Sequence, residues 1–281
     1  MEIIHKHPLH LGEGPLWDER LQALFFVDIM SKKFYVWHAK TNESTGYTFE
    51  EYISCLAFTQ DPNVIHIALE SGIYTFNLET SEKKFISQPE QQANYRYNDG
   101  AVDPYGNWLL GSMNNVNNGA GATLQPDATL YHIQGATSRA LLTGVTISNG
   151  IVFKDGSLYF IDSKLNTVRK FPYDGENLGT AETIFTLTDG TTLDGMTLSK
   201  SGKLYIANWG GSKILIFDLD TQKIVGDIPV PALNPTSCTF GGPEFNELYI
   251  TTSAIDDPNP ALAGVYRIKL EDSGFPEHKL K

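Results

Sequence analysis

Short apolar runs recur along the chain at a nearly constant spacing. Each run consists mainly of β-branched, aromatic or other apolar residues, and successive runs start 40 to 50 residues apart. The six runs begin at Leu24, Val64, Trp108, Leu158, Leu204 and Leu248. A second run follows each of them, in which apolar and polar residues alternate, as in residues 214–217. Alternation with a period of two, bounded by turn residues, indicates β-strands.

Each repeat contains a further strand on either side of these two runs. The preceding strands are expected at residues 14–17, 55–58, 100–102, 150–153, 195–198 and 238–240. A weaker fourth strand follows, for example at residues 183–187 and 224–228. Four strands in about 45 residues is the period of a β-propeller blade. The pattern therefore predicts an all-β, six-bladed propeller that occupies residues 1–281 as one domain. Two unrelated β-sandwiches would not produce six copies in one register.

The two ends of the chain are expected to complete one blade together. The sixth repeat lacks a fourth strand, because the nine residues after Asp272 include Pro276. Residues 2–7 precede the first repeat and have no other evident role. We expect this N-terminal strand to pair with the last blade and close the ring, which would leave no free sheet edge.

A polar residue precedes the innermost strand of every repeat. The six residues are Glu13, Ser54, Asn98, Asn149, Asp194 and Ser237. Four of them carry a carboxylate or a carboxamide, and they should converge because innermost strands line the central channel. Several are followed by glycine, and each such dipeptide alone would indicate only a tight turn. Their agreement in register favours a shared site instead.

The residue types in this set favour a hard divalent cation. Carboxylates and carboxamides around one narrow channel would stay unsatisfied and repel one another without a positive charge among them. Oxygen donors suit Ca²⁺, Mg²⁺ or Mn²⁺, whereas Zn²⁺ is less favoured without His or Cys ligands. The chain has no His-Glu-x-x-His motif, no nucleophile elbow around Ser112 and no glycine-rich phosphate loop.

Composition narrows the class of protein further. The 33 acidic residues exceed the 21 Lys and Arg residues and give a net charge of −12, which argues against nucleic acid as a partner. The two cysteines, Cys55 and Cys238, cannot form a disulfide framework and are expected to be buried packing residues. The N-terminus lacks the apolar core of a signal peptide, and no apolar run reaches the ~18 residues of a membrane span. We therefore expect a cytoplasmic protein without a membrane partner.

Several stretches that contain these residues resemble the SMP-30/gluconolactonase/regucalcin family. They are residues 12–17, 26–28, 96–106 with 111–113, 147–150, 193–196 and 237–242. The Arg-x-Asn-Asp-Gly stretch at 96–100 is the most specific, and together the stretches span nearly the whole chain in family order. The resemblance implies a six-bladed propeller with one divalent metal ion at the mouth of its channel, and it implies hydrolysis of sugar lactones.

The resemblance also implies roles for individual residues. Glu13, Asn149 and Asp194 match the family's metal ligands, and Asp194 also matches its proton-transferring residue. Arg96 and Asn98 match its substrate-binding pair.

One position departs from the family pattern. The family's substrate-contacting Glu has its nearest counterpart here in Gln125, within an Asn- and Gly-rich insertion at 114–127 that is expected to form a flexible loop over the site. Since Gln carries no charge, the family's sugar preference does not transfer to this chain.

The resulting hypothesis is metal-assisted hydrolysis of an aldonolactone. Asp194 would take a proton from the attacking water and return it to the leaving ring oxygen, with hydroxide on the metal ion as the alternative base. Two rival functions remain open: calcium-dependent hydrolysis of organophosphates or aryl esters, and a non-enzymatic, calcium-binding regulatory role. Arg96 and Asn98 argue against a simple ion store. The sequence does not specify the sugar, the ring size, the native metal or the oligomeric state.

Overall fold

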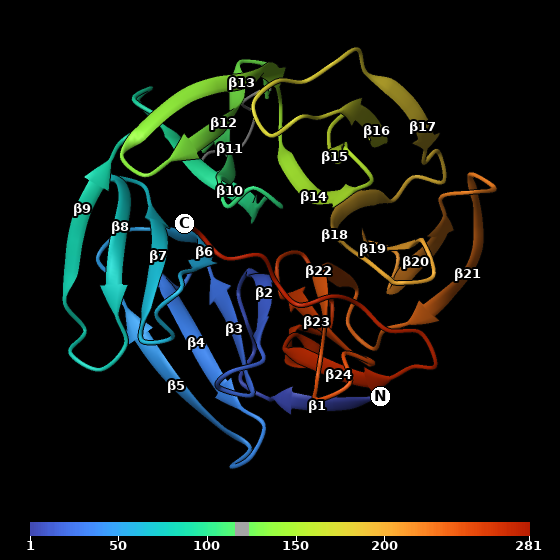
Figure 1. Ribbon diagram of the computed structural model, residues 1–281. Coiled ribbons are helices and arrows are strands. Elements are labelled where there is room, and N and C mark those ends of the chain that lie inside the picture. The colour runs from blue at the N-terminus through green and yellow to red at the C-terminus, as the bar shows by residue number, and fades with distance from the viewer. Residues whose placement is uncertain (116–123) are drawn as a thin grey trace.

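Six four-stranded antiparallel sheets surround a central channel in the computed structural model, which describes residues 1–115 and 124–281 (Figure 1). From the channel outwards, the first blade comprises β2 (Gly12–Asp18), β3 (Ala23–Asp28), β4 (Lys33–His38) and β5 (Glu43–Thr48). The second comprises β6 (Ile53–Phe58), β7 (Val64–Leu69), β8 (Gly72–Asn77) and β9 (Lys83–Ser87). The third comprises β10 (Tyr95–Val102), β11 (Trp108–Asn114), β12 (Ala128–Gln134) and β13 (Thr137–Val145).

The other three blades repeat this order. The fourth comprises β14 (Ser148–Lys154), β15 (Ser157–Asp162), β16 (Thr167–Pro172) and β17 (Glu182–Thr186). The fifth comprises β18 (Thr192–Leu198), β19 (Lys203–Trp209), β20 (Lys213–Asp218) and β21 (Lys223–Pro229). The sixth comprises β22 (Asn234–Gly241), β23 (Glu247–Ser253), β24 (Val265–Lys269) and β1 (Glu2–His5), with the short 3₁₀ helix η2 (Pro260–Leu262) between β23 and β24. The predicted six-bladed propeller is therefore confirmed.

The N-terminal strand closes the ring as expected. Strand β1 pairs antiparallel with β24, so that the first residues of the chain supply the outermost strand of the last blade. Arg267 on β24 forms an ion pair with Glu2, with 2.6 Å between Nη2 and Oε2. The pairing removes the free edge that β24 would otherwise expose.

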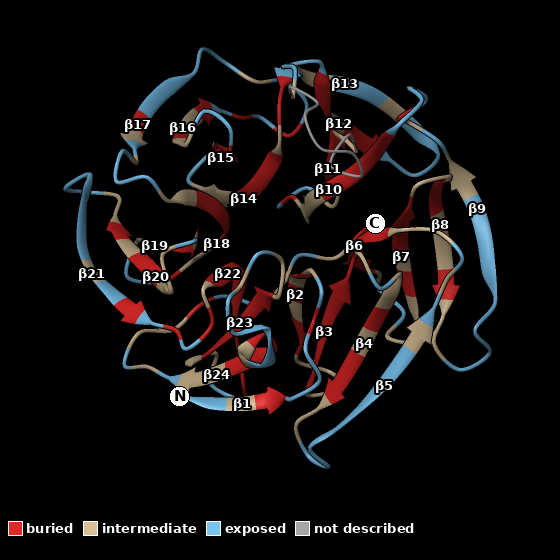
Figure 2. Ribbon diagram, turned by 180° about the vertical axis from the view of Figure 1, so that it is seen from behind, coloured by how far each residue is buried: buried red, intermediate tan, exposed pale blue. Residues whose placement is uncertain are grey.

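Burial follows the distance of each strand from the channel. The inner strands of each blade are mostly buried, whereas the outermost strands β5, β9, β13, β17 and β21 are largely exposed (Figure 2). Apolar side chains pack between neighbouring blades; for example, Phe25 of the first blade meets Phe58 of the second edge to face, with 5.1 Å between ring centroids. Cys55 and Cys238 are buried and unpaired, as predicted.

Every innermost strand carries a β-bulge or similar irregularity near its beginning. In β2 the register shifts between Glu13 and Leu16, and in β14 it shifts between Asn149 and Ile151. The equivalent shifts in the other four blades lie at residues 53–55, 97–100, 193–196 and 235–237. The expectation that the polar residues precede the innermost strands was therefore wrong: the strands begin earlier, and the polar residues lie at or beside the irregularity within them. A bulge bends the strand and redirects its side chains, which suits a site at the channel.

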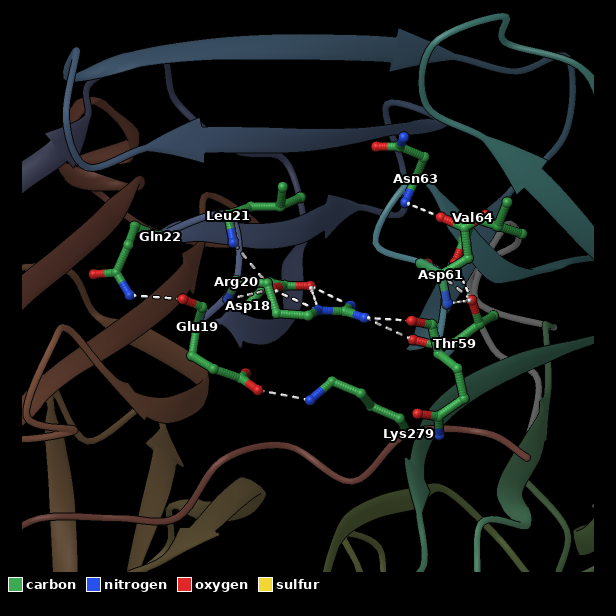
Figure 3. Close-up of polar contacts among 11 residues, drawn as sticks. Asp18, Glu19, Arg20, Leu21, Gln22, Thr59, Asp61, Asn63, Val64 and Lys279 are labelled. Carbon is green, nitrogen blue, oxygen red and sulfur yellow. Dashed lines mark hydrogen bonds and ion pairs between the residues drawn. The ribbon is translucent and has the colours of Figure 1, made fainter.

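The C-terminal segment, residues 273–281, crosses the channel end opposite these bulges (Figure 1). The backbone N–H of Leu280 donates to the carbonyl of Phe58, the last residue of β6. Lys279 forms an ion pair of 2.6 Å with Glu19, which follows β2 (Figure 3). Beside it, Arg20 pairs with Asp18 and donates to the carbonyl of Thr59, which joins the first two blades.

Within residues 1–115 and 124–281, the structure contains no helix with the length and apolar character that crossing a membrane requires.

Candidate functional site

Three carboxylates from three blades share one local arrangement at the bulges. Glu13, Asp99 and Asp194 each precede a glycine, and each side chain accepts a hydrogen bond from the N–H of that glycine. The distances are 3.2 Å from Gly14 to Glu13 and 2.8 Å from Gly100 to Asp99. This bond holds each carboxylate beside its own backbone, and the carboxylates of the first, third and fifth blades interact electrostatically.

Two glycines in this region, Gly150 and Gly195, allow the inner strands to approach each other closely. A Cβ on Gly150 would lie 2.9 Å from the carbonyl oxygen of Asp194, and one on Gly195 would lie 2.2 Å from Oγ of Ser237. Both contacts are shorter than any side chain tolerates. At these positions the glycines therefore permit close packing between blades, rather than the tight turns that the dipeptides alone would indicate.

A chain of buried hydrogen bonds links the polar residues of the third and fourth blades. Nη1 of Arg96 donates to Oδ1 of Asn98 at 2.6 Å and to the Tyr97 carbonyl at 2.8 Å. Nδ2 of Asn98 donates to Oδ1 of Asn149 at 3.0 Å and to the Ser148 carbonyl at 2.8 Å. Arg96, Asn98 and Asn149 are each less than 10% exposed. The residues predicted as substrate contacts therefore touch a residue predicted as a metal ligand.

The surroundings of the site disfavour the charged form of each of its three carboxyl groups. Burial raises the pKa of Glu13 well above its ordinary value, and the charges of Asp194 and Asp99 raise it further. Burial also raises the pKa of Asp194, with a second contribution from Asp99. The pKa of Asp99 is raised to about 6 by burial. Desolvation and like charge therefore act together against three ionised carboxylates at this end of the channel.

Arg96 compensates only part of this negative charge. Its guanidinium lowers the pKa of both Glu13 and Asp194, although less than burial raises them. When all are ionised, three carboxylates and one guanidinium leave a formal charge of −2. Two buried atoms at the site, Oδ1 of Asp194 and Nε of Arg96, have no hydrogen-bond partner within residues 1–115 and 124–281. A divalent cation matches both the residual charge and the unpartnered oxygen.

The structure brings together all five residues that the sequence singled out: Glu13, Arg96, Asn98, Asn149 and Asp194. It adds Asp99, which directly follows Asn98 in the sequence and was not among the predicted site residues. The signal was present, because Asp99 precedes Gly100 just as Glu13 precedes Gly14. Ser54 and Ser237 occupy the same register but contribute no charge.

The donors that could hold a cation are not all acidic. Among the described residues, no group of three or more His, Cys, Asp and Glu side chains is arranged to hold a metal ion. A cation held by Glu13 and Asp194 would therefore need further oxygen donors, and the neutral amide of Asn149 is a candidate. Oxygen ligands of this mixed kind suit Ca²⁺, Mg²⁺ or Mn²⁺ better than Zn²⁺.

The channel continues beyond the site as a cavity of about 90 Å³. Asp99 is the one of the six site residues that lines it, and Glu277 from the C-terminal segment lies at its other end. Oγ1 of Thr239 donates to the Glu277 carboxyl at 2.8 Å. The C-terminal segment thus closes the channel opposite the site.

The insertion at 114–127 lies partly outside the described residues, which omit 116–123. The expected loop over the site falls mainly on that segment. Gln125 is described and its side chain is exposed. Its suggested correspondence to a substrate-contacting Glu stays a prediction.

Known proteins share both the sequence and the fold. A family model described as the SMP-30/gluconolactonase/LRE-like region matches residues 11–254. The YvrE protein of Bacillus subtilis, a proposed sugar lactone lactonase, is 28% identical over 278 residues, which cover 94% of this chain and 93% of that protein. Regucalcin of Danio rerio is 30% identical over 277 residues, which cover 94% of this chain and 90% of that protein.

A solved structure extends the likeness to three dimensions. The structure of a luciferin-regenerating enzyme is 26% identical, with a TM-score of 0.90 and coverage of 98% of this chain and 96% of that chain. The family model spans most of the sequence, including the blades that supply the site. The chain therefore belongs to the SMP-30/gluconolactonase/LRE-like family.

Proposed function

We propose that this protein hydrolyses a sugar lactone, specifically an aldonolactone, to the sugar acid with the help of one divalent cation. Family membership supports a lactonase-type activity. The observation that carries the proposal is the set of desolvated carboxylates around Arg96, in which Oδ1 of Asp194 is buried and accepts no hydrogen bond from the described part of the chain. Burying such a set of charged groups costs free energy of folding, and groups of this kind with shifted pKa values cluster at functional sites.

Glu13, Asn149 and Asp194 would hold the cation, each through an oxygen atom. Ca²⁺, Mg²⁺ and Mn²⁺ fit these donors, and Zn²⁺ fits them less well. A bound cation would supply Lewis acidity, polarising the lactone carbonyl and offsetting the negative charge that develops on its oxygen.

Asp194 is the proposed proton carrier. Its carboxylate would accept a proton from the attacking water and return it to the ring oxygen as the ester bond breaks. Burial and the Asp99 charge raise its pKa, which makes the carboxylate a stronger base in the absence of a cation.

Arg96 and Asn98 would bind and orient the substrate. The Nε atom of Arg96 has no hydrogen-bond partner among the residues that the structure describes, so that it can donate to a lactone oxygen or a sugar hydroxyl. Asn98 supports Arg96, because its Oδ1 accepts from the guanidinium at 2.6 Å. Sugars present several hydroxyls, and buried donors discriminate well between substrates with and without a matching acceptor.

The experiment is a hydrolysis panel on metal-depleted protein. The protein is treated with EDTA, then Ca²⁺, Mg²⁺, Mn²⁺ and Zn²⁺ are added back separately, and acid release is followed with a pH indicator. The panel contains 1,4- and 1,5-aldonolactones, an aryl ester and an organophosphate triester. We expect hydrolysis of at least one aldonolactone, dependent on cation, at a kcat/KM well above that for the other two classes.

Two variants sharpen the panel. Asp194→Asn should abolish most lactone hydrolysis, whereas Glu277→Gln removes a carboxyl group from the far end of the channel and should leave the activity intact.

Faster turnover of the aryl ester or the triester would favour the first rival function, calcium-dependent hydrolysis of those compounds. Cation binding without hydrolysis of any compound would favour a calcium-binding, non-enzymatic role. Full activity in Asp194→Asn would contradict the proposed mechanism.

A further inference from the structure

We propose that Ser163 is a positioning residue that fixes the side-chain amide of Asn149 in one orientation. Ser163 follows β15 and is 7% exposed, so that its hydroxyl is shielded from water. Nδ2 of Asn149 donates to Oγ of Ser163 at 2.7 Å. Oγ of Ser163 in turn donates to the carbonyl of Leu193, the residue before Asp194, also at 2.7 Å. Ser163 thereby joins the Asn149 side chain to the strand that carries Asp194.

These bonds extend the chain of hydrogen bonds described above, and all of them point in one direction. Donation runs from Arg96 to Asn98, from Asn98 to Asn149, from Asn149 to Ser163, and finally to the backbone of Leu193. An amide or a hydroxyl can both donate and accept, so that neither group alone determines the direction.

The direction of donation is determined by the two ends of this series of hydrogen bonds, Arg96 and the Leu193 carbonyl. A guanidinium can only donate, which requires the oxygen of Asn98 to face Arg96. A backbone carbonyl can only accept, which requires the Ser163 hydroxyl to donate to Leu193 and therefore to accept from Asn149. The Ser148 carbonyl gives a second constraint, because it accepts from Nδ2 of Asn98 at 2.8 Å. Only one orientation of each amide satisfies every partner.

The consequence concerns the atom that Asn149 presents to the site. With its NH₂ group held by Ser163, Asn149 keeps its oxygen turned toward Asn98. A flipped amide would present N–H groups there, which cannot coordinate a cation. This consequence rests on the proposed cation site, whereas the orientation itself does not.

The test compares Ser163→Ala with a matched control. Ser253, at the end of β23, is also buried, and its Oγ donates to the His10 carbonyl at 2.7 Å, but it contacts none of the site residues. Ser253→Ala therefore deletes the same kind of hydroxyl from the same kind of environment. Ser163→Thr retains a hydroxyl and serves as the conservative variant.

The first readout needs neither metal nor activity. The side-chain NH₂ signal of Asn149 is identified in ¹⁵N spectra of the metal-free protein by its loss in Asn149→Asp. We expect hydrogen exchange of this group to become about tenfold faster in Ser163→Ala, because a buried hydrogen bond is lost. Ser253→Ala should leave it unchanged. Unchanged exchange in folded Ser163→Ala would overturn the assignment.

The second readout is the affinity for Ca²⁺, Mg²⁺ and Mn²⁺, measured by calorimetry. Loss of a residue that orients a ligand typically weakens metal affinity by about 10–100-fold, and we expect this range for Ser163→Ala, with Ser253→Ala near the parent protein and Ser163→Thr between them. Equal affinities in Ser163→Ala and the parent protein would contradict the positioning role. If the parent protein binds none of the three ions, the proposed function fails, and the exchange measurement still decides the orientation.

Discussion

The carboxyl groups of Glu13 and Asp194, from the first and fifth blades, lie near enough across the channel that the charge of Asp194 raises the pKa of Glu13. Both side chains are buried, at 6% exposure each, and burial raises both pKa values. Two desolvated carboxylates in this relationship oppose folding of the metal-free protein whenever both are ionised.

Neutralising either carboxylate should stabilise the metal-free protein and abolish its response to metal. We expect Glu13→Gln and Asp194→Asn each to raise the free energy of unfolding at pH 8 by about 1–2 kcal/mol, because repulsion and desolvation are relieved. The measurement is thermal unfolding with and without Ca²⁺ or Mg²⁺. The parent protein should gain stability on adding the ion, by the linkage between binding and folding.

A loss of stability in both metal-free variants would show that these carboxylates help to hold the fold together. Asp155→Asn is a suitable control, since Asp155 is exposed on the turn between β14 and β15, beyond the end of β14 opposite its bulge. It should change neither the stability nor the response to the ion appreciably.

Two replacements of Arg96 should distinguish the contribution of its positive charge to substrate binding from that of its hydrogen-bond geometry. We expect Arg96→Ala to raise KM for the lactone more than it lowers kcat, because a substrate-binding donor is lost. Arg96→Lys keeps the charge but cannot reproduce the contact with Asn98 at 2.6 Å together with a donor toward the substrate. Its KM should therefore lie between those of the parent protein and Arg96→Ala. Steady-state kinetics of the three proteins give the comparison. An unchanged KM in Arg96→Ala would show that Arg96 does not bind the substrate.

The architecture could be predicted from sequence because a propeller repeats. One weak strand pattern is ambiguous, but six copies in one register, ending in a blade without its fourth strand, leave little choice for residues 2–7. Four of the five site residues were found for the same reason, since they recur at one place in the repeat: Glu13, Asn98, Asn149 and Asp194. Arg96 was identified only through the family resemblance. The position of a residue within its repeat shows which residues of the other repeats are equivalent to it. The ring arrangement of the blades then brings equivalent residues together at the channel.

Other features could not be predicted because they depend on pairing or on contacts outside the repeat. The strand bounds were placed too late, since a bulge at Glu13 interrupts the alternation that marks a strand. Ser163 was missed because a lone serine after a strand has no distinguishing pattern. The closure of the channel by Glu277 and its neighbours was missed because the C-terminal segment belongs to no repeat.

Removal of the closing strand should destabilise the protein. Deletion of residues 1–8 breaks the pairing of β1 with β24 and removes the buried side chain of Ile4, which is 8% exposed. We expect a loss of about 2–5 kcal/mol and a tendency to associate through the exposed β24 edge. Differential scanning calorimetry and light scattering measure both effects. Glu2→Gln deletes only a surface ion pair and should cost less than about 1 kcal/mol.

The C-terminal segment should make stability depend on pH. Burial raises the pKa of Glu277 to about 7 from an ordinary value of 4.5. A raised pKa means that the folded state holds the proton more tightly, so that this stabilisation is complete below about pH 4.5 and is lost as the pH rises through 7. Glu277→Gln should therefore be more stable than the parent protein at pH 8, by at most about 3 kcal/mol.

The same two proteins should be nearly equal in stability at pH 5, where Glu277 is protonated. The free energy of unfolding, measured by denaturant titration at several pH values in metal-free buffer, gives the comparison. A constant difference across the pH range would mean that the Glu277 carboxyl does not titrate near 7.

The central claim is that one divalent cation among Glu13, Asn149 and Asp194 supports lactone hydrolysis. The most direct measurement is a titration of metal-depleted protein with Ca²⁺, Mg²⁺ or Mn²⁺ at a protein concentration far above Kd, with the rate of aldonolactone hydrolysis recorded at each addition. The account predicts a linear rise that ends at one ion per chain, and no rise with Asp194→Asn. Full hydrolysis before any ion is added, or an equal rise with Asp194→Asn, would contradict it.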